Sequence, residues 1–304
     1  MGTIALFGGS GFLGRRVAQR LIAAGQRVRV AVRDPERARG LLRGGGLEEA
    51  IVCRADVRAV DEVARAVEGA DAVVNAVSAY VEAGGVTFEA VHERGAEAVA
   101  RAAATAGAAR HVLVSGIGAD AAASSKYVRS RGRGEQLARQ AFPGTTLVRP
   151  SAMFGPGDAL TNTIAGLARV LPALPLIGSG RTRLQPVYVM DVAEAIARML
   201  AEPATAGRTH ELGGPAVYTL RELYTLILHL TGRRRLLLPV PLTLAGLLAR
   251  AFECLPRAPL TTGQVDLLES DNVATGALPG LRDLGIEPQS LAQIVPAYLH
   301  GRHP

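Results

Sequence analysis

The sequence has no tryptophan, two cysteines and one lysine among its 304 residues, and aromatic residues make up only 4% of it. Cys53 and Cys254 are too few for a disulfide framework and lack metal-site spacing, which is typical of a reduced intracellular protein. The scarcity of aromatic side chains argues against a surface that stacks nucleic-acid bases. Apart from Lys126, the basic residues are all arginines, a bias typical of a GC-rich genome. The net charge of +7 therefore does not indicate a nucleic-acid partner.

Long hydrophobic runs are also absent. Residues 236–248 come closest to the roughly 20 apolar residues that a membrane-spanning helix needs, but Pro239 and Pro241 interrupt them. The first strand-like run begins almost at the initial methionine, without the basic and apolar regions of a secretory signal. The histidines lack the spacing of metal ligands, so we predict no metal site. We expect a cytoplasmic bacterial protein, and peripheral attachment to the cytoplasmic face of the inner membrane stays open.

The first 150 residues alternate short apolar runs with stretches of helical period. The runs that read as strands are 3–7, 27–32, 50–54, 71–75, 111–115 and 145–149. The stretches that read as helices are 14–24, 35–42, 60–68, 88–106 and 125–141. Strict alternation of strands and helices predicts an α/β fold, a doubly wound parallel sheet of the Rossmann type with helices on both faces.

The pattern changes after Pro150. Proline, glycine and leucine crowd residues 155–186, and helices are predicted at 191–201, 220–231, 242–255 and 261–269. We expect a dinucleotide-binding domain over residues 1–150, to which 184–202 return. Residues 151–304 are expected to form a smaller, mostly helical region that shapes a substrate pocket or an interface.

A glycine-rich loop follows the first predicted strand and opens the first helix. Its pattern is G-x-x-G-x-x-G, with glycines at 8, 11 and 14. A phosphate must approach the amides of a helix N-terminus closely, and only glycine leaves room for that turn. The loop predicts dinucleotide binding through Gly8, Ser10, Gly11, Phe12, Leu13 and Gly14.

The end of the second strand bears on the choice between NADP(H) and NAD(H). An NAD-selective site usually has a carboxylate there for the ribose hydroxyls, but Arg33 comes first and Asp34 second. A guanidinium can pair with a ribose 2′-phosphate, so we favour NADP(H) and keep NAD(H) open. Asp34 followed by Pro35 is equally an ordinary helix start. Asp56 and Val57, after the third strand, are candidates for covering the adenine, and Asp56 could also be a simple turn residue.

Five stretches carry a resemblance to a known family, at residues 7–15, 70–75, 149–156, 185–193 and 210–215. Together with Asn75, Ser115 and Tyr127 they make the sequence similar to the short-chain dehydrogenases/reductases. More narrowly, the sequence resembles the atypical branch that includes the NAD(P)H-binding accessory subunit of respiratory complex I and its bacterial homologues. The resemblance implies further cofactor contacts from Ala76, Val77, Tyr127, Arg131 and Pro150.

The resemblance also implies a catalytic set. In that superfamily a tyrosine exchanges a proton with a carbonyl, a lysine four residues later assists it and binds the ribose, and a serine polarises the carbonyl. Tyr127 and Ser115 match, but the fourth residue after the tyrosine is Arg131. Arginine keeps the charge and the hydrogen bonds but cannot relay a proton, which puts reductase activity in doubt. Lys126 does not replace the lysine, because it points away from that face of the helix.

The second half of the chain offers two further features. Met153, Phe154, Leu184, Pro186 and Tyr188 could line an apolar pocket for a quinone-like ligand or could pack in the core. Three arginines at 233–235 precede a helix with an apolar stripe. The arginines and the helix could together form an interface with a membrane or a partner protein, or the arginines could be solvated beside a helix that faces the core.

We therefore consider three functions. The first is an accessory protein of a respiratory NADH:quinone system that holds NADP(H) tightly. The second is an active NADP(H)-dependent oxidoreductase or epimerase acting on an apolar carbonyl or quinone. The third is a nucleotide-sensing regulator. The sequence leaves the substrate and the oligomeric state open.

Overall fold

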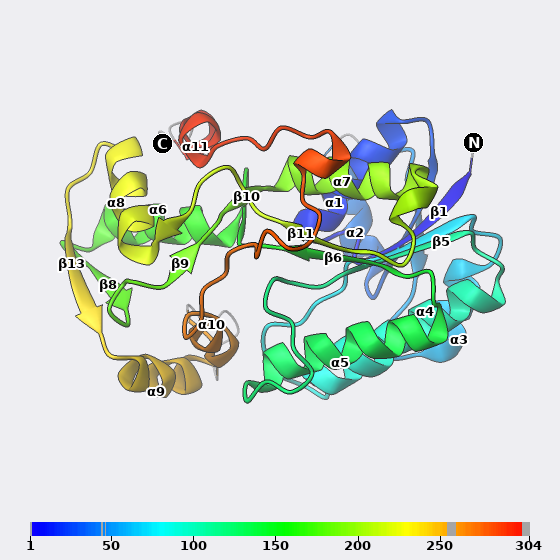
Figure 1. Ribbon diagram of the computed structural model, residues 1–304, viewed down its shortest axis with the longest axis horizontal. Helices are drawn as coiled ribbons and strands as arrows, with labels where there is room; N and C mark the ends of the chain where they lie inside the picture. The colour runs from blue at the N-terminus through cyan, green and yellow to red at the C-terminus, as the bar shows by residue number, and fades with distance from the viewer. Residues whose placement is uncertain (1, 44, 46, 254–259, 300–304) are drawn as a thin grey trace.

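A parallel sheet forms the centre of the molecule in a computed structural model, which describes residues 2–43, 45, 47–253 and 260–299 (Figure 1). Its seven strands have the spatial order β11-β6-β5-β4-β1-β2-β3. They are β1 (Thr3–Phe7), β2 (Arg27–Val32), β3 (Ile51–Arg54), β4 (Ala72–Asn75), β5 (Arg110–Val114), β6 (Thr146–Pro150) and β11 (Thr209–Leu212). The strands predicted in the first half are all present, each within one residue of its predicted ends.

Two layers of helices cover the sheet, because successive side chains of a strand face opposite sides. In β1, Leu6 packs into one apolar cluster and Phe7 into the other. Figure 1 shows the first layer above the sheet and the second below it. The first layer is α1 (Phe12–Ala23), α2 (Pro35–Arg43) and α7 (Val189–Ala201), and the second is α3 (Val60–Val67), α4 (Gly95–Thr105) and α5 (Lys126–Ala141). This arrangement confirms the predicted doubly wound fold.

One helix differs from its prediction. The stretch 88–106 is not a single α-helix, because it begins with the π-helical turn η1 (Glu89–Arg94) and continues as α4. The widened turn carries His92 towards α5. The two helical segments approach so closely that a Cβ at Gly134 of α5 would collide with the carbonyl of His92. Glycine at this position is therefore what allows the contact.

The smaller lobe contains more strand than the sequence predicts. Three two-stranded sheets join β7 to β10, β8 to β13 and β9 to β12. The strands are β7 (Met153–Phe154), β8 (Ala173–Ile177), β9 (Arg183–Leu184), β10 (Val187–Tyr188), β12 (Tyr218–Thr219) and β13 (Leu236–Val240). The helices are α6 (Ala159–Val170), α8 (Leu220–Leu230), α9 (Leu242–Phe252), α10 (Thr262–Leu267) and α11 (Leu291–Leu299), with short 3₁₀ turns η2 (Pro203–Thr205) and η3 (Arg282–Leu284). The expectation of a mostly helical region missed these strands and α6.

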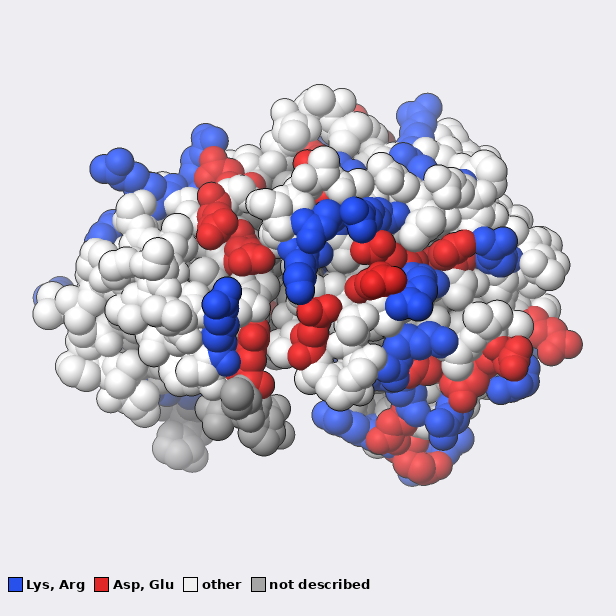
Figure 2. Space-filling view, turned by 90° about the horizontal axis from the view of Figure 1, so that it is seen from below, with Lys and Arg blue, Asp and Glu red and all other residues white. Residues whose placement is uncertain are grey.

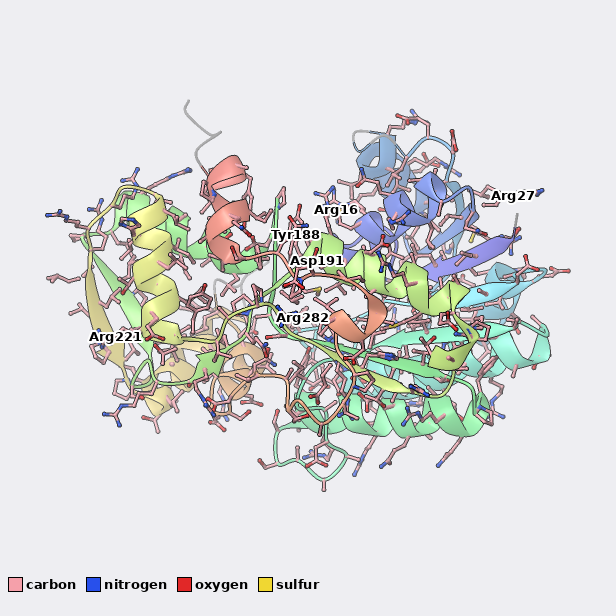
Figure 3. The ribbon with its side chains drawn as sticks, turned by 45° about the horizontal axis from the view of Figure 1, so that its top comes forward. Arg16, Arg27, Tyr188, Asp191, Arg221 and Arg282 are labelled. Carbon is pink, nitrogen blue, oxygen red and sulfur yellow. The ribbon has the colours of Figure 1, made fainter. Side chains whose placement is uncertain are left out.

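The last part of the chain ties the smaller lobe to the sheet. The backbone N–H of Glu211, in the edge strand β11, donates to the carbonyl of Pro279 and so covers the open edge. Asp191 in the first turn of α7 accepts hydrogen bonds from the backbone and the side chain of Gln289. Figure 3 shows Asp191 beside Tyr188, where the two lobes meet. Burial raises the pKa of Asp191 despite these two donors.

The predicted helix 242–255 ends at Phe252 among the described residues, and Leu255 and Cys254 lie outside them. None of the helices within the described ranges is long and apolar enough to cross a bilayer. Seen from below, charged side chains concentrate on the lobe with the sheet, and the surface of the smaller lobe is largely uncharged (Figure 2).

Candidate functional site

The glycine loop joins the end of β1 to the start of α1, as the sequence predicts. Gly8 has φ of +79°, and a Cβ there would come within 2.8 Å of the carbonyl oxygen of Ala76. A Cβ at Gly14 would collide with the carbonyl of Gly8, so the helix can only begin this close to the loop with glycine. The first turn of α1 has no acidic residue and no capping side chain. The helix dipole therefore points at the loop without compensation, an arrangement that fits a phosphate group.

The other predicted loop residues divide into two groups. Ser10 and Phe12 are partly exposed, whereas Leu13 is buried in the cluster against the sheet and offers only its backbone. Ala76 and Val77 run beside the loop after β4. The N–H of Ala76 donates to the carbonyl of Phe7, and the side-chain oxygen of Asn75 accepts from the N–H of Val77. The structure thus brings these residues together at one edge of the sheet.

Arg33 and Asp34 follow β2 at the same edge and have different surroundings. Asp34 caps α2, since its carboxylate accepts a hydrogen bond from the N–H of Arg37 at 3.0 Å. The side chain of Arg33 is exposed and makes no hydrogen bond or ion pair with the part of the chain that the structure describes. A free guanidinium at this position is available to an anionic ligand.

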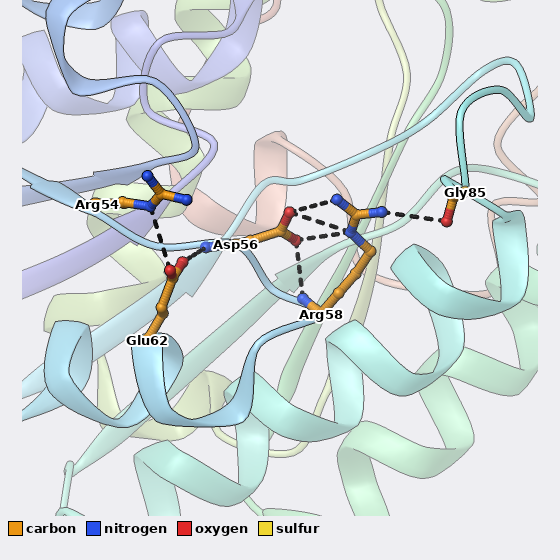
Figure 4. Close-up of polar contacts among 5 residues, drawn as sticks. All are labelled: Arg54, Asp56, Arg58, Glu62 and Gly85. Atoms are coloured by element: carbon orange, nitrogen blue, oxygen red, sulfur yellow. Dashed lines mark hydrogen bonds and ion pairs between the residues drawn. The ribbon is translucent and has the colours of Figure 1, made fainter.

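Asp56 follows β3 and is held by its own neighbour in sequence (Figure 4). Nε of Arg58 lies 3.0 and 3.1 Å from the two carboxylate oxygens of Asp56, and Nη2 lies 2.6 Å from one of them. These bonds lower the pKa of Asp56 below its ordinary value. Val57 is buried against Gly95 of α4. An adenine at this edge would meet a neutralised Asp56–Arg58 pair rather than a free carboxylate.

Tyr127 and Arg131 lie one turn apart on α5, with their polar ends in contact. Nη2 of Arg131 donates to the hydroxyl of Tyr127 at 3.0 Å and to Oγ of Ser78 at 2.6 Å, and Nη1 donates to the carbonyl of Val114 at 3.1 Å. Burial acts to lower the pKa of Arg131, but Tyr127 and Tyr80 outweigh it and the pKa is raised. The guanidinium is therefore a fixed positive charge beside the phenol.

Ser115 follows β5 and faces the same pocket as Tyr127, Arg131 and Pro150. Its backbone N–H donates to the carbonyl of Val148, whereas its buried Oγ has no partner among the described residues. Nε of Arg131 is a second buried donor without a partner there. Buried polar atoms are rarely left unpaired, so these two fit a polar group that enters from outside the chain, such as a ribose or a carboxamide.

Comparison with known proteins gives the family. Residues 8–203 match the NAD(P)H-binding family. The chain belongs to that family. It is 35% identical over 289 residues to rat mitochondrial NADH dehydrogenase [ubiquinone] 1 alpha subcomplex subunit 9, covering 94% of this chain and 76% of the relative. It is 32% identical to the mitochondrial 40 kDa subunit of NADH-ubiquinone oxidoreductase of Neurospora crassa, with 98% and 78% covered.

A third relative of this NAD(P)H-binding protein is named as an enzyme, the ceramide reductase of Caulobacter vibrioides, 32% identical with 86% of this chain and 82% of the relative covered. Among solved structures, dTDP-glucose 4,6-dehydratase from Streptomyces venezuelae with NAD bound superposes with a TM-score of 0.72 at 22% identity, covering 98% and 96%. The likeness to solved structures supports the fold. The relatives confirm the resemblance to the complex I accessory-subunit branch.

Sequence reasoning missed several residues of this candidate site. The backbone N–H of Ala79 donates to Nε2 of His92, so Nδ1 carries the proton towards Oγ of Ser130, 2.9 Å away. Ser130 in turn donates to the carbonyl of Tyr127. Burial, with a contribution from Arg131, lowers the pKa of His92 to about 2, so the imidazole is neutral. No spacing in the sequence predicts this, because the loop after β4 brings the partners together.

The ring of Tyr80 stacks on Tyr127, with centroids 5.7 Å apart, and was also not predicted. The neighbouring Tyr127 phenol raises the pKa of Tyr80, 48% of which is exposed to solvent.

The smaller lobe closes the pocket with Met153, Leu267 and Asn272. The side-chain oxygen of Asn272 accepts from the hydroxyl of Ser151 and from the N–H of Ala152. The core alternative holds for Phe154, Leu184 and Pro186, which are all buried, and Tyr188 packs on Phe154. Of the five residues proposed to line an apolar pocket, Met153 is the one that lines this pocket. No group of three His, Cys, Asp or Glu side chains in the described ranges could hold a metal ion.

Beneath the pocket, an ion pair fixes the helix that carries Tyr127. Arg149 of β6 donates to both carboxylate oxygens of Glu135 on α5, from Nε at 2.9 Å and from Nη2 at 2.5 Å. The Glu135 side chain is 6% exposed and that of Arg149 21%. The pair thus joins α5, which carries Tyr127, to β6, which ends at Pro150 in the pocket lining.

Proposed function

We propose that this protein is an accessory component of a respiratory NADH:quinone system in a bacterial cell, holding NADP(H) as a tightly bound cofactor. The observation that carries the proposal is the contrast between the two ends of the site. At the glycine loop, a Cβ at Gly8 or Gly14 would meet the backbone of Ala76 or Gly8, whereas the position of the family's catalytic lysine holds an arginine bound to Tyr127, Ser78 and Val114. The site is suited to grip a nucleotide rather than to relay protons.

The chain's own residues have distinct tasks in this proposal. Residues 1–150, with 184–202, form the nucleotide-binding unit, and 151–304 form the substrate or interface region. The amides of the glycine loop hold the pyrophosphate, and Arg33 pairs with the ribose 2′-phosphate. Asp56 and Val57 flank the adenine. Ala76, Val77 and Pro150 border the nicotinamide half, where Tyr127 and Arg131 hold the ribose. NADP(H), when bound, supplies a hydride donor or acceptor.

An exposed apolar face on the smaller lobe supports the interface role. In α9 the small residues Ala245 and Ala249 point inward, whereas Leu244, Leu247 and Leu248 are 47%, 63% and 40% exposed. The adjoining strand β13 exposes Leu236 and Leu238, and the arginines at 234 and 250 are exposed beside them. Exposed arginines next to an apolar face fit the anionic surface of a membrane. We propose that the α9/β13 face binds the inner membrane peripherally.

This face is tested by sedimentation with vesicles of phosphatidylcholine, with and without phosphatidylglycerol. We expect binding only to the anionic vesicles and its loss in Leu247→Glu. Val60→Glu is the matched control, since Val60 is 67% exposed on the opposite lobe. Equal loss in both variants, or no binding by the wild type, would contradict the proposal.

A second function is favoured by one observation, that Ser115 and Tyr127 line the same pocket. In an active reductase or epimerase Ser115 would orient the substrate carbonyl, Tyr127 would exchange its proton with the carbonyl oxygen, and Arg131 would hold the ribose. The substrate would be an apolar carbonyl or a quinone.

The dissociation rate of NADPH from the purified protein, with NADH in parallel, separates the two functions. Release over hours, with nucleotide retained through purification, supports the accessory role. Release within a second, with NADPH held more tightly than NADH, supports the enzyme. In the enzyme, Tyr127→Phe abolishes turnover and keeps binding, and Arg131→Lys restores the lysine of the family and raises turnover. The absence of binding to either nucleotide would refute both functions.

A further inference from the structure

The carboxyl ends of β2 and β3 bring an arginine and an aspartate side by side. Val32 is paired with Arg54 in the sheet, and the N–H of Ala55 donates to the carbonyl of Val32. Arg33 and Asp56 therefore leave the sheet at neighbouring positions. Arg33 is close enough to contribute to lowering the pKa of Asp56, after the larger effect of Arg58. An unpaired carboxylate at this place would attract the guanidinium of Arg33.

Arg58 prevents that pairing. It contacts both oxygens of the Asp56 carboxylate, and its remaining nitrogen, Nη1, donates to the carbonyl of Gly85 at 3.2 Å (Figure 4). All three guanidinium nitrogens are thus engaged within the chain. The orientation of Asp56 is fixed from its other side as well, because its backbone N–H donates to Glu62.

We propose that Arg58 is a specificity-determining residue, which occupies Asp56 so that Arg33 stays free for the 2′-phosphate of NADP(H). The inference rests on the proposed preference for NADP(H). It gives Arg58 a positioning role, because its own donors are already used. The clamp also removes the repulsion that a free carboxylate would exert on the phosphate.

A carboxylate at the end of the second strand is the usual mark of an NAD site, but here Arg33 takes that place, and the carboxylate of Asp56 follows the third strand. Here the carboxylate is neutralised from within by a residue two positions later, and the exposed arginine on the neighbouring strand is left without a partner in the described ranges.

The test compares the affinities for NADPH and NADH, and for the fragments 2′,5′-ADP and AMP, by calorimetric titration of the full chain. The variants are Arg58→Ala, Arg58→Ala with Asp56→Asn, and Arg33→Ala. Arg54→Ala is the matched control, because Arg54 is a basic residue at the same edge that pairs with Glu62 and not with Asp56. The ratio of the affinities for NADPH and NADH should fall about tenfold in Arg58→Ala and in Arg33→Ala. A tenfold change corresponds to the loss of one hydrogen bond between charged groups.

The double variant decides the mechanism. We expect Asp56→Asn to restore the preference in the Arg58→Ala background, because no free carboxylate then competes for Arg33, and we expect Arg54→Ala to keep it. A double variant as poor as Arg58→Ala would overturn the clamp and indicate direct phosphate contact by Arg58. An unchanged preference in Arg58→Ala would overturn the inference alone, whereas a wild type without preference would overturn the proposed NADP(H) specificity as well.

Discussion

The ion pair between Arg149 and Glu135 allows a prediction whose size follows from its burial. Replacing Arg149 with Met removes two short hydrogen bonds and leaves the Glu135 carboxylate, 6% exposed, without its counter-charge. Breaking a buried pair from one side costs about 3 to 5 kcal/mol. Because the Arg149 side chain keeps 21% of its surface in solvent, we expect the lower end, about 3 kcal/mol of the free energy of unfolding.

The assay is urea unfolding of the nucleotide-free protein, followed by circular dichroism. Replacing both partners, in Arg149→Met with Glu135→Leu, should recover part of the loss, since the Glu135 charge is then no longer buried alone. Glu211, a buried carboxylate 4.0 Å from Nη1 of Arg149, still loses its ion pair in this variant. Arg282→Ala is the control, because the Arg282–Glu287 pair is exposed and its loss should leave the stability nearly unchanged. A loss below about 1 kcal/mol in Arg149→Met, or a double variant no more stable than the single one, would refute the reasoning.

Three further outcomes are expected. Burial lowers the pKa of His92 to about 2 and that of His111 to about 3. As the pH falls below the ordinary histidine pKa of 6.5, these two side chains take up protons in the unfolded chain but stay neutral in the folded one. The contribution of the two neutral histidines to stability is therefore fully present above pH 6.5. Below about pH 6 the free energy of unfolding should fall by about 2 to 3 kcal/mol per pH unit. Unfolding measured at several pH values should show half this slope in His111→Gln. Gly14→Ala should abolish nucleotide binding because the new Cβ collides with the loop backbone, whereas Gly40→Ala, with open space around it, should keep it in the same titration. Ser115→Ala should raise the stability of the nucleotide-free protein by about 0.5 to 1 kcal/mol in urea unfolding, since its buried hydroxyl lacks a partner among the described residues, and a decrease would contradict this.

The sequence predicts the sheet well where strands and helices alternate, because the two periods differ and glycines separate them. It fails at the edge strand β11, whose residues Thr209–Leu212 include a histidine and a glutamate that are buried only through tertiary contacts. It also missed α6, which a carboxylate at Asp158 caps inside a segment rich in proline and glycine.

The candidate site likewise has one part that the sequence predicts and one part that it does not. The glycine loop carries its geometry in its own spacing, so the sequence is sufficient to find it. The surroundings of Tyr127 depend on Ser78 and His92, which a loop and a π-helical turn bring to it from other parts of the chain. The replacement of the family lysine by Arg131 was visible in the sequence, but its three bonding partners were not.

The cover over β11 has a consequence for the order in which the protein is made. Synthesis proceeds from the amino terminus, so the first six strands of the sheet leave the ribosome well before Pro279 does. Until Pro279 is available, the outer strand β11 has an open edge, and Ser151 in the pocket wall lacks its hydrogen-bond partner Asn272. A chain that stops before residue 272 would thus contain the whole glycine loop and yet present an unpaired strand edge, which is the form that aggregates.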